Sequence, residues 1–217
     1  MAQIFKPIDN TFFRGIIVGG LLLLIGWITT AIMHQWSSSQ TGVGIPLAQP
    51  VPFSHEHHVE GLGIDCRFCH TSVEKSSFAG MPSTETCMKC HQEIWKDSPM
   101  LLPVRESYRT GKPIVWNRVH NLPDFVYFDH SIHVQKGIAC QVCHGKVESM
   151  PLMRKENTLY MGWCMSCHEH PGHYVALHQN NQRQPPKTPT EMSYKPWDPN
   201  IDPKRVKEIR NCSACHR

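Results

Sequence analysis

The longest apolar stretch of the chain lies near its N-terminus. Residues 16–33 carry no charged side chain over eighteen positions. A helix of that length rises by about 27 Å, close to the thickness of the hydrocarbon core of a bilayer. The pattern therefore predicts one transmembrane helix, within an N-terminal membrane anchor formed by residues 1–36.

Basic residues flank this stretch on one side only. Lys6 and Arg14 precede it, and the next Lys or Arg along the chain is Arg67. Because Lys and Arg favour the cytoplasmic side of a membrane, we expect a single pass through the inner (cytoplasmic) membrane with residues 37–217 on the extracytoplasmic, periplasmic side. The alternative is a cleaved signal peptide, which is disfavoured because no small-x-small site directly follows the apolar run.

Beyond the anchor, apolar residues show little regular periodicity. Residues 37–52 are rich in Ser, Gly and Pro and are typical of a linker. Only 40% of the 217 residues are apolar, and 17 prolines interrupt the chain. We therefore expect short helices and loops with little sheet, and an apolar core that needs internal staples.

All ten cysteines fall into Cys-x-x-Cys pairs, and a histidine follows each pair. The pairs are Cys66 and Cys69, Cys87 and Cys90, Cys140 and Cys143, Cys164 and Cys167, and Cys212 and Cys215, followed by His70, His91, His144, His168 and His216. Two thiols at this spacing can add to the two vinyl groups of one haem, while the adjacent histidine reaches the iron as proximal ligand. The motifs predict five covalently attached haem c groups in a multihaem cytochrome c fold, a haem-packed domain of short helices.

Two alternatives explain the cysteines less completely. A secreted chain with an even cysteine count can be a disulfide scaffold, and paired cysteines can form zinc knuckles. Neither explains five histidines in the same place, which chance would produce with a probability of roughly 10⁻⁶. The formal charge of +4 does not indicate nucleic-acid binding, because the propionates of five haems make the loaded protein acidic.

The chain also contains an internal repeat. The pattern Phe-x-His-x-x-His-Val precedes the first and third motifs, and a glycine (Gly61, Gly137), a Val-Glu pair and a Met-Pro pair follow in the same order. The repeat predicts a pentahaem domain over residues 53–217. It comprises two-haem modules at about 53–91 and 128–168 and a fifth haem at 212–216.

The repeated histidines are the expected distal ligands of four haems. They are His55, His58, His130 and His133. Histidines three positions apart on a helical turn point roughly the same way and can reach two neighbouring irons. His57 has Ile132 as its counterpart and is expected at the surface.

The distal ligand of the fifth haem is less tightly specified by the sequence. His120, in a structured-looking stretch between the modules, is favoured, and His173 is the second choice ahead of His170 and His178. A methionine is a further alternative at one haem, because Met is a competing axial ligand that raises the potential. We expect bis-histidine iron at most or all haems.

The clustered motifs resemble those of the class III multihaem cytochromes c. The short anchor, the two modules joined by residues 116–133 and the terminal motif at 212–216 resemble more specifically the pentahaem cytochrome subunit of alternative complex III. That resemblance implies a menaquinol-oxidising respiratory or photosynthetic complex. Its iron–sulfur and multispan membrane subunits would supply electrons, and a cytochrome, copper protein or oxidase would accept them.

Three functions fit the motifs. The first is a non-catalytic electron relay inside such a complex, with no catalytic residue of its own. The second is a stand-alone quinol dehydrogenase that feeds a periplasmic reductase, which requires an open haem beside the anchor. The third, a multihaem catalytic reductase, requires an open haem with acid–base groups nearby. The matched histidines favour the relay.

Overall fold

The computed structural model describes residues 6–169, 171 and 203–216. The chain divides into two units, Met1–Val43 and Gly44–Arg217. Each unit is described by itself below.

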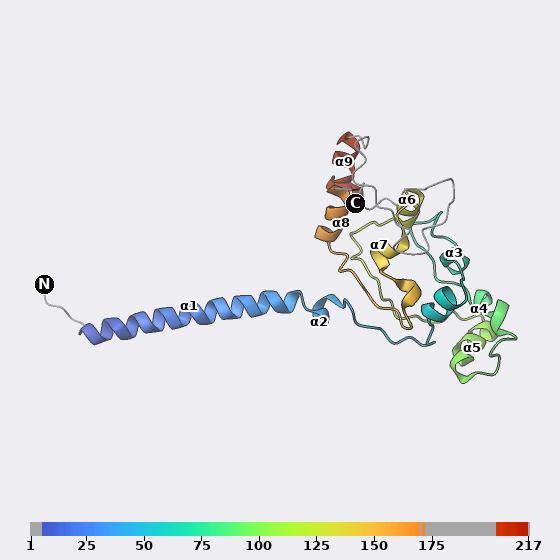
Figure 1. The fold of residues 1–217 in the computed structure, drawn as a ribbon, viewed down its shortest axis with the longest axis horizontal. Helices are drawn as coiled ribbons and strands as arrows, with labels where there is room; N and C mark the ends of the chain where they lie inside the picture. The colour runs from blue at the N-terminus through green and yellow to red at the C-terminus, as the bar shows by residue number, and fades with distance from the viewer. Residues whose placement is uncertain (1–5, 170, 172–202, 217) are drawn as a thin grey trace. The chain divides into compact units, whose positions relative to one another are not determined.

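The first unit is built around one long helix. Helix α1 spans Pro7–Gln35, and the short helix α2 spans Ser38–Thr41 (Figure 1). Pro7 suits the first helical position, and the side chain of Asp9 accepts a hydrogen bond of 2.8 Å from the backbone N–H of Lys6. The hydroxyls of Thr29 and Thr30 donate to carbonyls one turn earlier, which satisfies them without water. Within the described part of the chain, α1 is the one helix long and apolar enough to cross a membrane.

The second unit consists of short helical segments. They are η1 (Glu56–Gly61, a π-helix), α3 (Cys66–Cys69), α4 (Thr84–His91), η2 (Pro99–Leu101), α5 (Leu102–Thr110), α6 (His130–Gln135), α7 (Cys140–His144), η3 (Val147–Ser149), α8 (Met161–Glu169), α9 (Pro203–Ile209) and α10 (Cys212–Cys215). The described residues form no β-strand, only isolated bridges such as Pro46–Arg154. The predicted architecture of short helices and loops is confirmed.

The apolar core of this unit is small. Val51, Leu101 and Val104 form its main cluster, against which Met88 and Trp116 pack. Six apolar residues in the described part of the chain are buried, and among them only Met150 has no exposed surface. A domain with so few buried side chains needs another source of cohesion, as the composition indicated.

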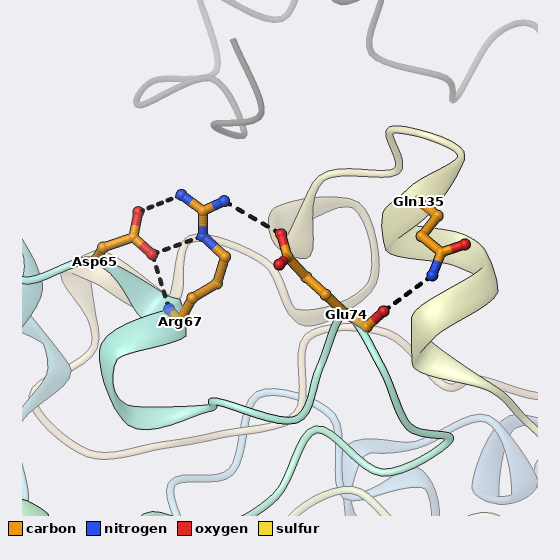
Figure 2. A network of polar contacts seen from close by, with 4 residues as sticks. All are labelled: Asp65, Arg67, Glu74 and Gln135. Atoms are coloured by element: carbon orange, nitrogen blue, oxygen red, sulfur yellow. Dashed lines mark hydrogen bonds and ion pairs between the residues drawn. The ribbon is translucent and has the colours of Figure 1, made fainter.

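The two sequence repeats are tied together directly. Arg67 in α3 bonds Asp65 on one side and the Glu74 carboxylate on the other, and the Glu74 carbonyl accepts a 3.0 Å hydrogen bond from Gln135 at the end of α6 (Figure 2). The backbone N–H of His130 donates to the Ser77 carbonyl at 3.2 Å. The start of the second repeat is therefore docked on the loop that follows the first Cys-x-x-Cys-His motif.

Candidate functional site

Each Cys-x-x-Cys pair lies on a helical turn, which places its two thiols on one side of the helix. The side chains of Asp65 and Asn211 cap the first and last of these turns by accepting from the N–H two residues on. The N–H of the following histidine bonds back to the first cysteine, from His70 to Cys66 at 2.9 Å for example. None of the ten cysteines, all of which lie in the described part of the chain, forms a disulfide.

The imidazoles near these motifs are oriented by backbone carbonyls. In seven of them Nδ1 lies 2.6–3.1 Å from a carbonyl oxygen: His58 on Ser54, His70 on Gly80, His91 on Ile94, His130 on Ser77, His133 on Asp129, His168 on Ile209 and His216 on Phe125. Such a bond fixes the proton on Nδ1 and leaves Nε2 as the free donor atom, as metal-bound histidines require.

One of these carbonyls depends on a glycine. Gly80 has a positive φ of 78°, and an added Cβ would lie 2.6 Å from the hydroxyl of Ser72. The carbonyl of Gly80 is the acceptor 2.6 Å from Nδ1 of His70. A side chain at position 80 would therefore disturb the loop that orients this histidine.

Three pairs of predicted ligands face each other at closely similar distances. The ring centres lie 6.2 Å apart for His58 and His91, 6.3 Å for His130 and His144, and 6.3 Å for His133 and His168. Two imidazoles on opposite sides of one metal ion, with metal–nitrogen bonds of about 2.0–2.1 Å, have ring centres about 6.3 Å apart. These spacings fit iron held by a distal and a proximal histidine.

A phenylalanine organises the distal histidines in the same way in both repeats. Phe53 meets His55 edge-on at 4.9 Å and stacks on His58 at 4.4 Å. Phe128 meets His130 edge-on at 4.7 Å and stacks on His133 at 4.5 Å. The repeated Phe-x-His-x-x-His motif therefore produces the same cluster of three rings twice.

The fourth predicted distal ligand, His55, lies near His70. Burial lowers the pKa of His55 to about 4, with further lowering by His70 and His58. Its buried Nδ1 has no hydrogen-bond partner among the described residues. Burial likewise lowers the pKa of His144 to about 3. Burial therefore keeps these imidazoles neutral, which is the form that binds a metal ion.

His120, the predicted fifth distal ligand, lies beside His144. Its Nε2 is 3.4 Å from Nδ1 of His144, and the two ring centres are 4.4 Å apart at 86°. That separation is too short for the two rings to share one iron. His216, the predicted proximal ligand of the fifth haem, contacts Phe125, and their ring centres are 5.8 Å apart in a stacked arrangement. The alternatives His170, His173 and His178 lie outside the described residues.

His57, expected at the surface, has an exposed side chain stacked on Trp95 at 5.8 Å. The acceptor carbonyls of Ser77, Gly80 and Ile94 were not found from the sequence. A carbonyl is present at every residue, so no side chain marks it as the partner of a histidine. Among these three residues, only Gly80 has a residue type that hints at its role, because its positive φ favours glycine.

The site fits covalent haem better than zinc. A zinc knuckle needs four convergent Cys and His ligands, but no group of three or more metal-binding side chains converges among the described residues. Pairs of thiols beside pairs of opposed imidazoles match a macrocycle attached by two thioethers, with iron between two histidines. These residues would hold the group, and when bound it supplies one-electron chemistry.

Comparisons with known proteins agree with this geometry. Residues 126–217 match the family described as cytochrome c7 and related cytochrome c. The multiheme cytochrome c subunit of menaquinone reductase from Nitratidesulfovibrio vulgaris is 28% identical over 194 residues, covering 80% of this chain and 92% of that protein. The acrylate reductase cytochrome subunit from Shewanella woodyi is 26% identical over 94 residues, covering 43% of this chain and 62% of that protein.

Proposed function

We propose that this chain, which has a multihaem cytochrome c domain, is a membrane-anchored pentahaem relay with covalently bound haem c. It passes single electrons on the extracytoplasmic face of the membrane, within a quinol-linked oxidoreductase complex. The ten cysteines hold five haems and the histidine after each pair is the proximal ligand. His55, His58, His130 and His133 are the distal ligands of the first four.

One observation carries this proposal: the five motifs are neighbours in an unbroken series. The pKa of Cys66 is lowered chiefly by the side chain of Cys140, so the first and third motifs lie next to each other. The pKa of Cys87 is raised by burial and then by Cys69, which links the second motif to the first. This part of the series runs from the second motif through the first to the third.

The series continues to the C-terminus. The pKa of Cys143 is raised by burial and by the neighbouring Cys167 and Cys164, which link the third and fourth motifs. The pKa of Cys164 is raised by burial and by Cys215, which links the fourth to the fifth. The attachment sites thus follow the order 2–1–3–4–5, which suits a wire with the second and fifth haems at its ends.

Backbone contacts support the same order. The proximal His168 of the fourth motif bonds the Ile209 carbonyl just before the fifth motif. The N–H of Tyr127, upstream of the second repeat, donates to the Cys215 carbonyl at 2.8 Å. The fifth motif is therefore held against the second module and the segment directly upstream of it.

The membrane face is proposed from the charges that flank α1. Arg14 lies within the first half of this helix and Lys6 directly precedes it. Treating right-side-out vesicles with a protease should remove the haem domain and leave α1 in the membrane. Full protection of the haems from the protease would mean that the orientation is reversed.

The partners are proposed from the similarity to cytochrome subunits of a menaquinone reductase and an acrylate reductase. Iron–sulfur and multispan membrane subunits would exchange electrons with the quinone pool. A second cytochrome, a copper protein or an oxidase would accept them. We combine this similarity with the two-module pattern and propose that the chain is the pentahaem subunit of alternative complex III.

A stand-alone quinol dehydrogenase is the second proposal. The similarity to the cytochrome subunit of an acrylate reductase favours it, since such a subunit delivers electrons to a reductase. In that case one haem would lack a firm sixth ligand and quinol would bind beside α1. The paired histidines at 6.2–6.3 Å leave no such open position at three of the five sites.

One experiment separates the two functions. The detergent-purified holoprotein is mixed with a menaquinol analogue, and electron paramagnetic resonance records the spin states of its haems. The relay predicts five low-spin haems and negligible quinol oxidation without partner subunits. Saturable quinol oxidation by the isolated protein, together with a high-spin haem, would establish the dehydrogenase.

A further inference from the structure

The partner of Nδ1 sets one proximal histidine apart from the others. His70, His91, His168 and His216 all place Nδ1 against a backbone carbonyl. His144 places it instead against the imidazole of His120, 3.4 Å away. The third motif is thus the one whose proximal ligand contacts a second histidine through Nδ1.

Coordination would define the direction of this hydrogen bond. If Nε2 of His144 binds iron, the proton of the neutral ring must lie on Nδ1, which then donates. Nε2 of His120 is the acceptor, and the proton of His120 lies on its own Nδ1. The ring planes at 86° agree with an N–H that points at a lone pair in the plane of the other ring.

His120 is held in place by the segment around it. Asn117 and Gln49 exchange two hydrogen bonds, from the Asn117 N–H to the Gln49 side chain at 2.9 Å and from that side chain to the Asn117 carbonyl at 2.8 Å. The Asn117 side chain also donates to the Ala48 carbonyl at 2.7 Å. Trp116 packs against the Val51 cluster. The imidazole is therefore presented to His144 by an anchored stretch.

We propose that His120 is a positioning residue for the third haem, which accepts the hydrogen bond of His144 and lowers the reduction potential of that haem. An imidazole nitrogen is a stronger base than an amide oxygen, so it draws the proton of His144 more strongly. The proximal ring then donates more electron density to iron and favours the ferric state. The inference rests on the proposed ligation by His144 and replaces the assignment of His120 to the fifth haem.

The test compares His120→Leu with the wild-type holoprotein by potentiometric titration and electron paramagnetic resonance. The proposal predicts five low-spin haems, with one midpoint potential shifted upward and four unchanged. The variant His130→Ala makes the third haem high-spin and so labels it. When His120→Leu is added to that variant, the midpoint potential that rises should be the potential of the high-spin haem. His57→Leu, an exposed histidine outside the repeat, is the matched control and should leave all five potentials unchanged.

Two results would overturn the proposal. Five unchanged potentials in His120→Leu would show that His120 does not act on the third haem. Conversion of one low-spin haem to high-spin would show that His120 is an iron ligand. If His120→Leu does not mature, His120→Gln carries the test, because its amide accepts more weakly and should give a smaller upward shift. A wild-type protein with fewer than five haems would contradict the proposed function, which is a separate result.

Discussion

The two modules build the same histidine cluster on different backbones. In the second module His130 and His133 lie on the α-helix α6, whereas in the first His57 and His58 lie on the π-helix η1, with His55 at its start. The ring distances to the phenylalanine nevertheless agree within about 0.2 Å between the modules. Nδ1 of the second histidine contacts the carbonyl four residues earlier in both, on Ser54 and on Asp129.

The π-helix has a cause in the sequence. His58 is followed by Cys66 after eight positions, but His133 is followed by Cys140 after seven. A wider π turn accommodates one extra residue without moving the ends of the segment. The same shift corrects the glycine alignment: Gly63, with a φ of 69°, is the counterpart of Gly137 at 80°, and Gly61 is not.

The hydrogen bonds behind the ligands differ between the modules. In the first, buried Nδ1 of His55 has no partner among the described residues, and His70 donates to a carbonyl. In the second, His130 donates to the Ser77 carbonyl, and His144 faces His120. Repetition thus preserves the ligand frame but not the groups that adjust ligand basicity, so the first and third haems should differ in potential.

The largest expected effect comes from removing the second haem of the second module, compared with removing the second haem of the first. Cys164→Ala with Cys167→Ala removes an internal attachment site and should isolate the fifth haem from the other three. Cys87→Ala with Cys90→Ala removes a terminal site and should leave four haems in rapid exchange. Stopped-flow reduction followed at the haem absorbance measures this contrast. Equal behaviour of the two variants would contradict the order 2–1–3–4–5.

The next largest effect comes from the distal histidines. His130→Ala and His133→Ala should each convert one low-spin ferric signal to high-spin, with an upward or heterogeneous shift of its potential. His57→Ala should leave all five haem spectra unchanged, because it lies outside the repeat. Electron paramagnetic resonance of each purified variant makes the comparison. A disturbance in His57→Ala without one in His58→Ala would mean that the repeat is misaligned.

A smaller effect should follow from deleting Leu62. This exposed residue follows η1, and its loss gives the first module the seven-residue spacing of the second. We expect an α-helical turn in place of the π turn, with five low-spin haems retained. Haem stoichiometry and spin state test this. Loss of the first or second haem would show that the extra residue is required for ligation.

The smallest effect should come from the contact between the modules shown in Figure 2. Gln135→Ala removes one exposed hydrogen bond to the Glu74 carbonyl. The free energy of unfolding should fall by about 0.5 kcal/mol, the low end for a single hydrogen bond. Denaturant titration of the holoprotein measures it. A loss of several kcal/mol from Gln135→Ala would mean that this contact holds the modules together.

The sequence was most informative where side chains carry the chemistry. The cysteine spacing located every attachment turn, and the Phe-x-His-x-x-His repeat located histidines that the structure pairs at 6.2–6.3 Å. The sequence was least informative where backbone groups make the contacts. The π turn at Glu56–Gly61 and the contact of the Gly80 carbonyl with Nδ1 of His70 depend on the path of the backbone. Neither is marked by a side chain that carries the chemistry. The position of His120 against His144 is a tertiary contact between residues 24 positions apart.

Intact-mass spectrometry of the fully matured chain tests the central claim most directly. Thioether bonds survive denaturation and acid–acetone extraction, so each covalently attached haem adds its own mass to the polypeptide. The account predicts one dominant species that carries five haem additions, one for each Cys-x-x-Cys-His motif. A dominant mature species with four or fewer additions would contradict it.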